Sequence, residues 1–222
     1  MPRPVLTPAT AARSEWPDVS LPGLASNIRK FGFVPNLNAL LPGDVLLVTA
    51  PRSVPLVVRT AQRSYGFSPE HARWTHAALY IGDGQIIEAT LSEGVRAKDM
   101  IPATFRYDIL VRRRLNPPLS DAQRCEIVAL ARETIGKNYG TRTVVRLSGQ
   151  AVSGGRAGAR GHTTPHSGDT AICSGIVQSV YFGGVGLDLV PSLEGDVAWP
   201  GHLSETGKLT DISIGWLKVA TE

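Results

Sequence analysis

The fold is decided by residues 76–90, which read HAALYIGDGQIIEAT. Two runs rich in β-forming residues flank the Gly-Asp-Gly at 82–84, where glycine supplies the positive φ that a tight turn needs. The stretch therefore predicts a β-hairpin. If the turn holds three residues, Tyr80 faces Glu88, and His76 shares that face because side chains alternate along a strand. A two-residue turn without a bulge puts Glu88 on the opposite face.

The neighbouring segments add strands to this hairpin. The turn LPGD at 41–44 precedes an apolar run of strand length at 45–48, and Asp44 is predicted to be a turn residue rather than a catalyst. Residues 95–98 and 109–113 predict two further strands. The hairpin and these strands together predict a small antiparallel sheet. The variable segment that leads to Trp74 is assigned no element.

Two longer helices are predicted after the strands. Ser120 followed by Gln123 has the form of a capping box, apolar residues follow at helical spacing, and Gly136 can end this helix. A second helix begins near Asp169 or Thr170 and stops at the glycines 183–184. A short helix is also predicted at about 25–31. The mixture of strands and helices predicts an α+β fold.

The composition predicts one folded domain with appendages. A chain of 222 residues suffices for one full core, and its 42% hydrophobic and 19% charged residues are typical of a globular protein. We expect an N-terminal arm at 1–38 and a main domain at 39–222. A flexible loop rich in Gly, Ser and Thr is predicted at about 148–168.

Charge and apolar patterning limit the partners. The net charge is +4, but the basic residues are scattered apart from the run at 112–114, so no nucleic-acid partner is expected. Contact with an anionic membrane or cell-wall surface stays open. No apolar run is long enough to span a membrane and no signal-peptide core precedes residue 22, so the default localisation is the cytoplasm, with export by a specialised secretion system left open. His162 and His166 lie in the Gly- and Pro-containing loop, so no metal and no cofactor is expected.

Cys173 is the candidate nucleophile. It lies in the first turn of the predicted second helix, where unpaired backbone N–H groups and the helix dipole favour the thiolate. Ser174 and Gly175 beside it are small enough to let a substrate carbonyl approach. The alternative is a buried apolar role, which free cysteines commonly have. Cys125 lies in the middle of the other helix and is predicted to be structural.

His76 and Glu88 supply the partners that such a nucleophile needs. A histidine that starts an apolar strand is commonly an edge residue, but a carboxylate follows twelve residues later on the return strand. A carboxylate beside an imidazole fixes its tautomer and raises its basicity. We therefore predict His76 as the base and Glu88 as the residue that orients it.

Four motifs resemble a known family. The stretch CSGIVQ at 173–178 is similar to the nucleophile helix of the NlpC-type, papain-like cell-wall endopeptidases, and GKNYG at 136–140 is similar to their tyrosine-bearing segment. The PGD at 42–44 with its strand, and the hairpin from His76 to Glu88, resemble their base hairpin. His76 precedes Cys173, as in the circularly permuted branch that includes YiiX-like hydrolases and the lecithin–retinol acyltransferase group.

This resemblance implies a fold and a set of roles. Residues 39–222 would form a permuted papain-like catalytic domain with the nucleophile at a helix N-terminus. Cys173 would be the nucleophile, His76 the general base and Glu88 the orienting residue. Tyr139 would line the site near the oxyanion, and Ser174 and Tyr80 would complete the binding residues.

The implied function is cysteine hydrolysis of an amide bond through a thioester acyl-enzyme, with a peptidoglycan stem peptide as substrate. A lipid acyl hydrolase or acyltransferase that uses the same triad is the alternative, and a non-catalytic binding module is the third. Because a cell-wall or lipid substrate does not match a cytoplasmic protein, a further hypothesis is a secreted antibacterial effector with an immunity or secretion partner.

Overall fold

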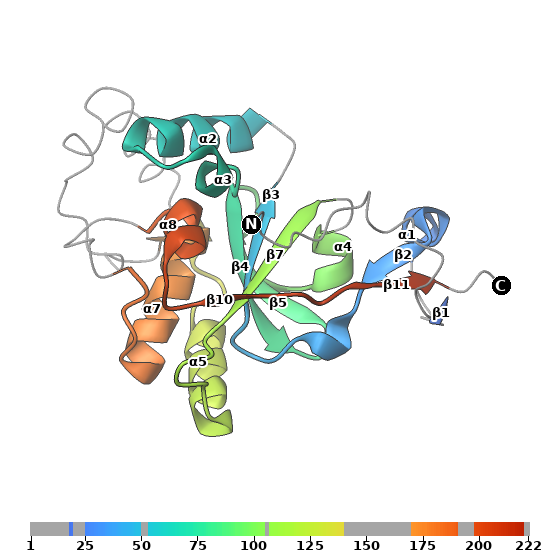
Figure 1. The fold of residues 1–222 in the computed structure, drawn as a ribbon. Helices are drawn as coiled ribbons and strands as arrows, with labels where there is room; N and C mark the ends of the chain where they lie inside the picture. The colour runs from blue at the N-terminus through green and yellow to red at the C-terminus, as the bar shows by residue number, and fades with distance from the viewer. Residues whose placement is uncertain are drawn as a thin grey trace.

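The structure is a computed structural model that describes residues 18–19, 25–49, 53–104, 107–139, 170–190 and 198–219 (Figure 1). Its centre is a six-stranded antiparallel sheet with the strand order β10-β7-β3-β4-β5-β6. The strands are β3 (Val45–Thr49), β4 (His76–Gly82), β5 (Gln85–Thr90), β6 (Gly94–Asp99), β7 (Asp108–Arg113) and β10 (Thr210–Ile212). The sequence-based prediction of an antiparallel sheet is confirmed, and β10 joins it from the C-terminal part of the chain.

The β4–β5 hairpin differs from the predicted register. Its turn holds two residues, Asp83 and Gly84, which both have positive φ, at 52° and 72°. A bulge between Tyr80 and Gly82 shifts the pairing, so that Ala78 and not Tyr80 lies opposite Glu88. The predicted pairing of Tyr80 with Glu88 is therefore wrong. The bulge nevertheless keeps Glu88 on the face of the sheet that carries His76.

Two helices cover one face of the sheet. These are α5 (Asp121–Glu133) and α7 (Cys173–Val185), and they pack on the strands through a shared apolar core that includes Leu47, Leu79, Ile87, Ile127 and Ile176. The capping box at the start of α5 is confirmed, since Ser120 Oγ accepts from the Gln123 N–H and Gln123 Oε1 accepts from the Ser120 N–H. The helix α7 packs on β4 and β5, and α5 packs on α7.

The start of α7 differs from the prediction. Residues Thr170–Ala171 form the short strand β9, which pairs in parallel with β8 (Asn138–Tyr139), and the helix begins only at Cys173. The helix also continues past the glycines at 183–184 and ends at Gly186, whose φ is 65°. Cys173 is thus the first residue of the helix.

The opposite face of the sheet carries a second apolar cluster around α4 (Met100–Thr104), which packs against Ala78, Ile86 and Ile109. Figure 1 shows α4 on this side and α5 and α7 on the other. His76, Ala78 and Glu88 point to the α4 side. The site therefore lies where this face meets the end of the sheet.

A third unit, at the β3–β4 end, was not predicted. It consists of α2 (Ser53–Tyr65), α3 (Pro69–Ala72) and α8 (Pro200–Glu205), which share an apolar cluster with Ile172 and Trp199. The buried Gln62 amide joins them, because it donates to the carbonyls of Ala72 and Trp74 and accepts from the Gly201 N–H. It thereby fixes the backbone that leads into His76.

The remaining elements lie at the two ends of the chain. They are β1 (Asp18–Val19), α1 (Ser26–Phe31), β2 (Phe33–Pro35), the 3-10 helix η2 (Leu37–Ala39) and β11 (Trp216–Val219). The strands β1, β11 and β2 form a separate three-stranded sheet, so part of the predicted N-terminal arm pairs with the C-terminal strand. The predicted loop at 148–168 lies outside the described residues.

Candidate active site

Cys173 lies at the N-terminus of α7, buried between the helix and the sheet, with 6% of the residue exposed. Its sulfur accepts hydrogen bonds from the backbone N–H groups of Ala77 and Ser174. The Ser174 hydroxyl donates to the Ala198 carbonyl over 2.5 Å and holds the start of the helix in place. Backbone N–H groups and the positive end of the helix dipole surround the sulfur, so this position favours the thiolate.

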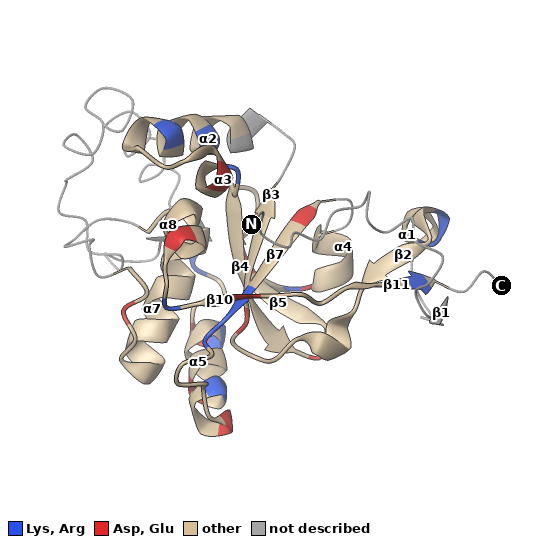
Figure 2. Cartoon of the chain, viewed as in Figure 1, with Lys and Arg blue, Asp and Glu red and all other residues tan. Residues whose placement is uncertain are grey.

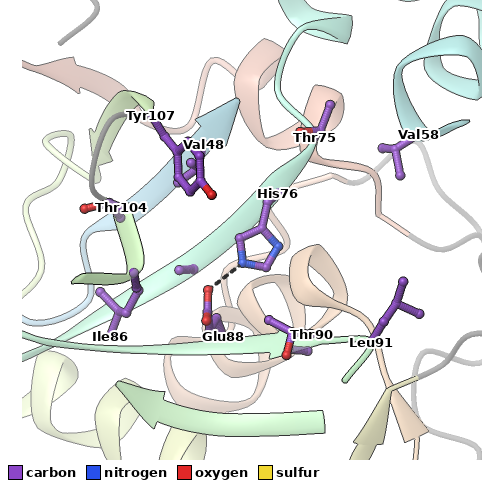
Figure 3. A pocket seen from close by; sticks show the side chains of 13 residues that line it. Val48, Val58, Thr75, His76, Ile86, Glu88, Thr90, Leu91, Thr104 and Tyr107 are labelled. Carbon is purple, nitrogen blue, oxygen red and sulfur yellow. Dashed lines mark hydrogen bonds and ion pairs between the residues drawn. The ribbon is translucent and has the colours of Figure 1, made fainter. Parts of the chain in front are cut away.

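His76 is the first residue of β4, and its imidazole lies between Cys173 and Glu88. Its Nε2 atom is 2.8 Å from Glu88 Oε2 (Figure 3). The ring also forms a hydrogen bond with Cys173. Because Nε2 is bound to Glu88, Nδ1 is the nitrogen that is left for the sulfur. The structure therefore brings the three residues of the predicted triad together.

The charges at this site support one another. Burial on its own lowers the pKa of His76, but the charge of Cys173 and the hydrogen bonds to Cys173 and Glu88 raise that pKa to about 10. Burial on its own raises the pKa of Cys173, yet the charge and hydrogen bond of His76 and the two backbone N–H groups lower it overall. The two shifts have opposite signs, so both favour the form of the pair in which Cys173 is a thiolate and His76 an imidazolium.

Glu88 has a second partner that sequence reasoning missed. Lys98 Nζ, on β6, lies 3.3 Å from Glu88 Oε1 and also binds Glu93. Burial on its own raises the pKa of Glu88, whereas His76 and Lys98 lower it overall and keep the carboxylate ionised. The sequence held a signal for this contact, because residues 96 and 98 of the next strand are both basic. Residues two positions apart lie on one face of a strand, and here that is the face of Glu88.

A cavity of about 280 Å³ adjoins the base and its carboxylate (Figure 3). Its walls are mostly apolar, and no Lys or Arg is among the described residues that line it, which are Val48, Val58, Thr75, His76, Ala78, Ile86, Glu88, Ala89, Thr90, Leu91, Ala103, Thr104 and Tyr107. Cys173 does not line it. The Thr90 hydroxyl of this lining residue is buried and has no hydrogen-bond partner within the described residues.

The backbone arrangement is similar to that of one solved structure, the metalloprotein YiiX from Escherichia coli O157:H7. The TM-score is 0.53 with 16% sequence identity, and the match covers 79% of this chain and 97% of the YiiX chain. The fold is YiiX-like. No family model and no curated protein matches the sequence. At this identity the likeness to YiiX shows the fold alone.

Within this YiiX-like fold, the other predicted residues are placed as follows. Ser174 lies beside the sulfur, as described above. Tyr80 lies toward the far end of β4, packs against Ile86, and accepts the Gly84 N–H with its hydroxyl, so the structure does not bring it to His76. The Tyr139 side chain lies outside what the structure describes. Cys125, which was predicted to be structural, is exposed on α5.

The described residues hold neither a candidate membrane-spanning helix nor a candidate metal cluster. No helix there is long and apolar enough to cross a membrane. No group of three or more His, Cys, Asp or Glu side chains in the described ranges has an arrangement suited to a metal ion.

Proposed function

We propose that this chain is a cysteine hydrolase of acyl compounds, with Cys173 as nucleophile, His76 as acid–base catalyst and Glu88 as the residue that orients His76. The observation that carries the proposal is the chain of contacts from Cys173 through His76 to Glu88, in which the Cys173 pKa is lowered and the His76 pKa is raised. A nucleophile, a base and an orienting carboxylate in contact are the signature of covalent acyl transfer.

The chemistry follows from these positions. The Cys173 thiolate attacks the substrate carbonyl and forms a tetrahedral intermediate, whose oxyanion accepts hydrogen bonds from backbone N–H groups at the start of α7. His76, protonated in the resting pair, donates its proton to the leaving amine or alcohol as the carbonyl bond to that group breaks. A thioester remains on Cys173. Neutral His76 then takes a proton from water, which attacks the thioester and releases the carboxylic acid and the thiolate.

Glu88 acts on this cycle through His76. Its carboxylate holds Nε2, and so directs Nδ1 toward the sulfur and stabilises the imidazolium. The resemblance of the sequence motifs to circularly permuted, papain-like NlpC-type enzymes supports this proposal, and those motifs lie on α7 and on the β4–β5 hairpin.

The first substrate class is an amide of a peptidoglycan stem peptide, as the sequence motifs indicate. A second class is an ester of an apolar acyl chain, as in a phospholipid. It is favoured by the cavity beside His76, because the described lining is mainly apolar and holds no cation to pair with a peptide carboxylate. Either substrate fits an antibacterial effector that is exported by a specialised secretion system and neutralised by an immunity protein.

The deciding experiment offers the purified chain both muropeptides and phospholipids and identifies the products by mass spectrometry. The variants are Cys173→Ala and, as the matched control, Cys125→Ala at the exposed cysteine. We expect the wild type and the control to release one class of product and Cys173→Ala to release none. Equal product from Cys173→Ala would exclude the nucleophile. Binding of a substrate by all three proteins without any product would instead identify a binding module.

A further inference from the structure

A second hollow is built on the same strand and the same helix as the cavity beside His76, and arginines line it. Its volume is about 450 Å³, and its lining is Thr49, Arg59, Arg63, Pro69, Ala72 and Arg73. The two spaces share no lining residue, but two pairs of consecutive residues contribute one residue to each. Val48 and Val58 line the cavity, and the residues that follow them, Thr49 and Arg59, line the hollow. The hollow and the cavity are thus built on the same strand end and the same helix.

The three arginines are set in different ways. Arg73 binds Asp108 over 2.5 Å and lies over the Trp74 ring, 5.0 Å from its centroid, so its position is fixed. Arg63 donates to the Phe67 carbonyl over 3.3 Å, which leaves its charge without a counterion in the described part of the chain. Arg59 has no ion pair within the described residues and is exposed.

The charge of this hollow is one-sided. The helix α2 carries Arg59 and Arg63 and no acidic residue, and Figure 2 shows basic positions on α2. Asp108 forms an ion pair with Arg73, and the exposed Glu70 on α3 does not line the hollow. Arg59 and Arg63 are four residues apart, so they lie on one face of the helix, where like charges repel and destabilise it.

An anion removes this repulsion. We propose that the hollow is an oxyanion-binding subsite, which takes a phosphate or carboxylate group of an acyl substrate whose apolar part occupies the cavity beside His76. The planar guanidinium groups match such oxyanions with paired N–H donors, which an ammonium group does not. Arg73, fixed by Asp108 and Trp74, forms the rigid wall, and Arg59 and Arg63 close on the anion from α2. The subsite assignment rests on the proposed function, whereas the binding of an oxyanion does not.

Inorganic phosphate is the probe for binding. It is titrated into the full chain while the arginine Nε–H signals are followed by NMR, for the wild type, the double variant Arg59→Gln/Arg63→Gln and the control Arg132→Gln, which removes an exposed arginine from α5. Because hydrogen bonds to charged groups contribute most to such sites, we expect the double variant to bind roughly tenfold more weakly and the control to match the wild type. Equal affinity in all three proteins, or shifts confined to arginines outside the hollow, would overturn the proposal.

Kinetics test the assignment to the substrate. Two esters with one acyl chain are compared, one with a phosphate group at the far end of the alcohol and one with a neutral hydroxyl there. We expect the double variant to raise KM for the anionic ester alone, with kcat unchanged, because the subsite binds a part of the substrate that does not react. Phosphate binding without any preference between the two esters would refute the subsite. If neither ester is hydrolysed by the wild type, the proposed function fails, and the phosphate titration alone still decides whether the hollow binds oxyanions.

Discussion

Substitution of Glu88 by Gln tests the electrostatics of the site without a change of shape. The carboxylate now accepts from His76 with Oε2 and from Lys98 with Oε1. An amide supplies only one acceptor. If its oxygen turns to His76, its NH₂ group meets the Lys98 ammonium, and two donors face each other. If its NH₂ group turns to His76, Nε2 has to accept a hydrogen bond, so the proton of the neutral ring moves to Nδ1. The nitrogen that faces Cys173 then carries a proton and cannot accept one from the thiol.

The magnitude follows from the contact that is lost. A hydrogen bond to a charged group contributes about 1.5–3 kcal/mol, which corresponds to roughly 10- to 100-fold in the population of the thiolate–imidazolium pair. Iodoacetamide alkylates the thiolate, so its rate reports that population without knowledge of the substrate. On the acidic limb of the pH profile, where the rate is proportional to the thiolate fraction, we expect Glu88→Gln to be slower by this factor.

The assay uses a Cys125→Ser background, so that only Cys173 reacts, and mass spectrometry counts the alkylated chains between pH 5 and pH 10. The direction of the pH dependence follows from the pKa shifts of Cys173 and His76. We expect the wild type to be alkylated below the pH range in which a thiol usually ionises, because the Cys173 pKa is lowered. Turnover of a substrate is expected to fall as the pH rises through about 10, where His76 loses the proton that the leaving group needs. Superimposable profiles for wild type and Glu88→Gln would refute the claim that Glu88 sustains the pair.

Three further substitutions test other parts of the structure. Lys98→Met removes the partly exposed cation from Glu88, so we expect kcat/KM to fall only about two- to fivefold, and a hundredfold loss would contradict this view of a surface ion pair. Arg112→Met leaves four carbonyls and Asp211 without their buried donor, and we expect a loss of about 3–5 kcal/mol in urea unfolding. Gly94→Ala places a Cβ 2.5 Å from the Lys137 carbonyl at a φ of 68°, and thermal unfolding is expected to show a cost of about 1–3 kcal/mol.

The sheet and the pairing of His76 with Glu88 could be predicted because their signals are local. Each signal lies within a dozen residues: the run of β-forming residues of a strand, the glycine of a turn, and the capping box of a helix. The hairpin carries His76 and Glu88 together. The exact pairing could not be predicted, since the bulge at Ile81 is fixed by the packing of the whole sheet. The direction of the Glu88 side chain was correct only because the shorter turn and the bulge compensate.

The elements around α2 could not be predicted for a different reason. The helix has a strong amphipathic pattern, but the proline at 55 and the β-branched residues around it obscure that pattern in the sequence. Its role depends on Gln62, whose three buried partners come from segments that are remote in sequence. Lys98 was missed because an ion pair across strands becomes visible only when the order of the strands is known.

The order of His76 and Cys173 along the chain has no bearing on the chemistry, because the site depends on three elements that converge. The helix α7 supplies its positive end, β4 supplies a base at its first residue, and β5 supplies the carboxylate one strand away. The backbone N–H of Ala77 forms a hydrogen bond with the sulfur, so the strand that carries His76 also lowers the pKa of Cys173. A displacement of α7 along the sheet would therefore break both the contact with His76 and this hydrogen bond. The buried Ser174 hydroxyl on the Ala198 carbonyl opposes that displacement, which makes it a structural requirement of the pair rather than a part of the reaction.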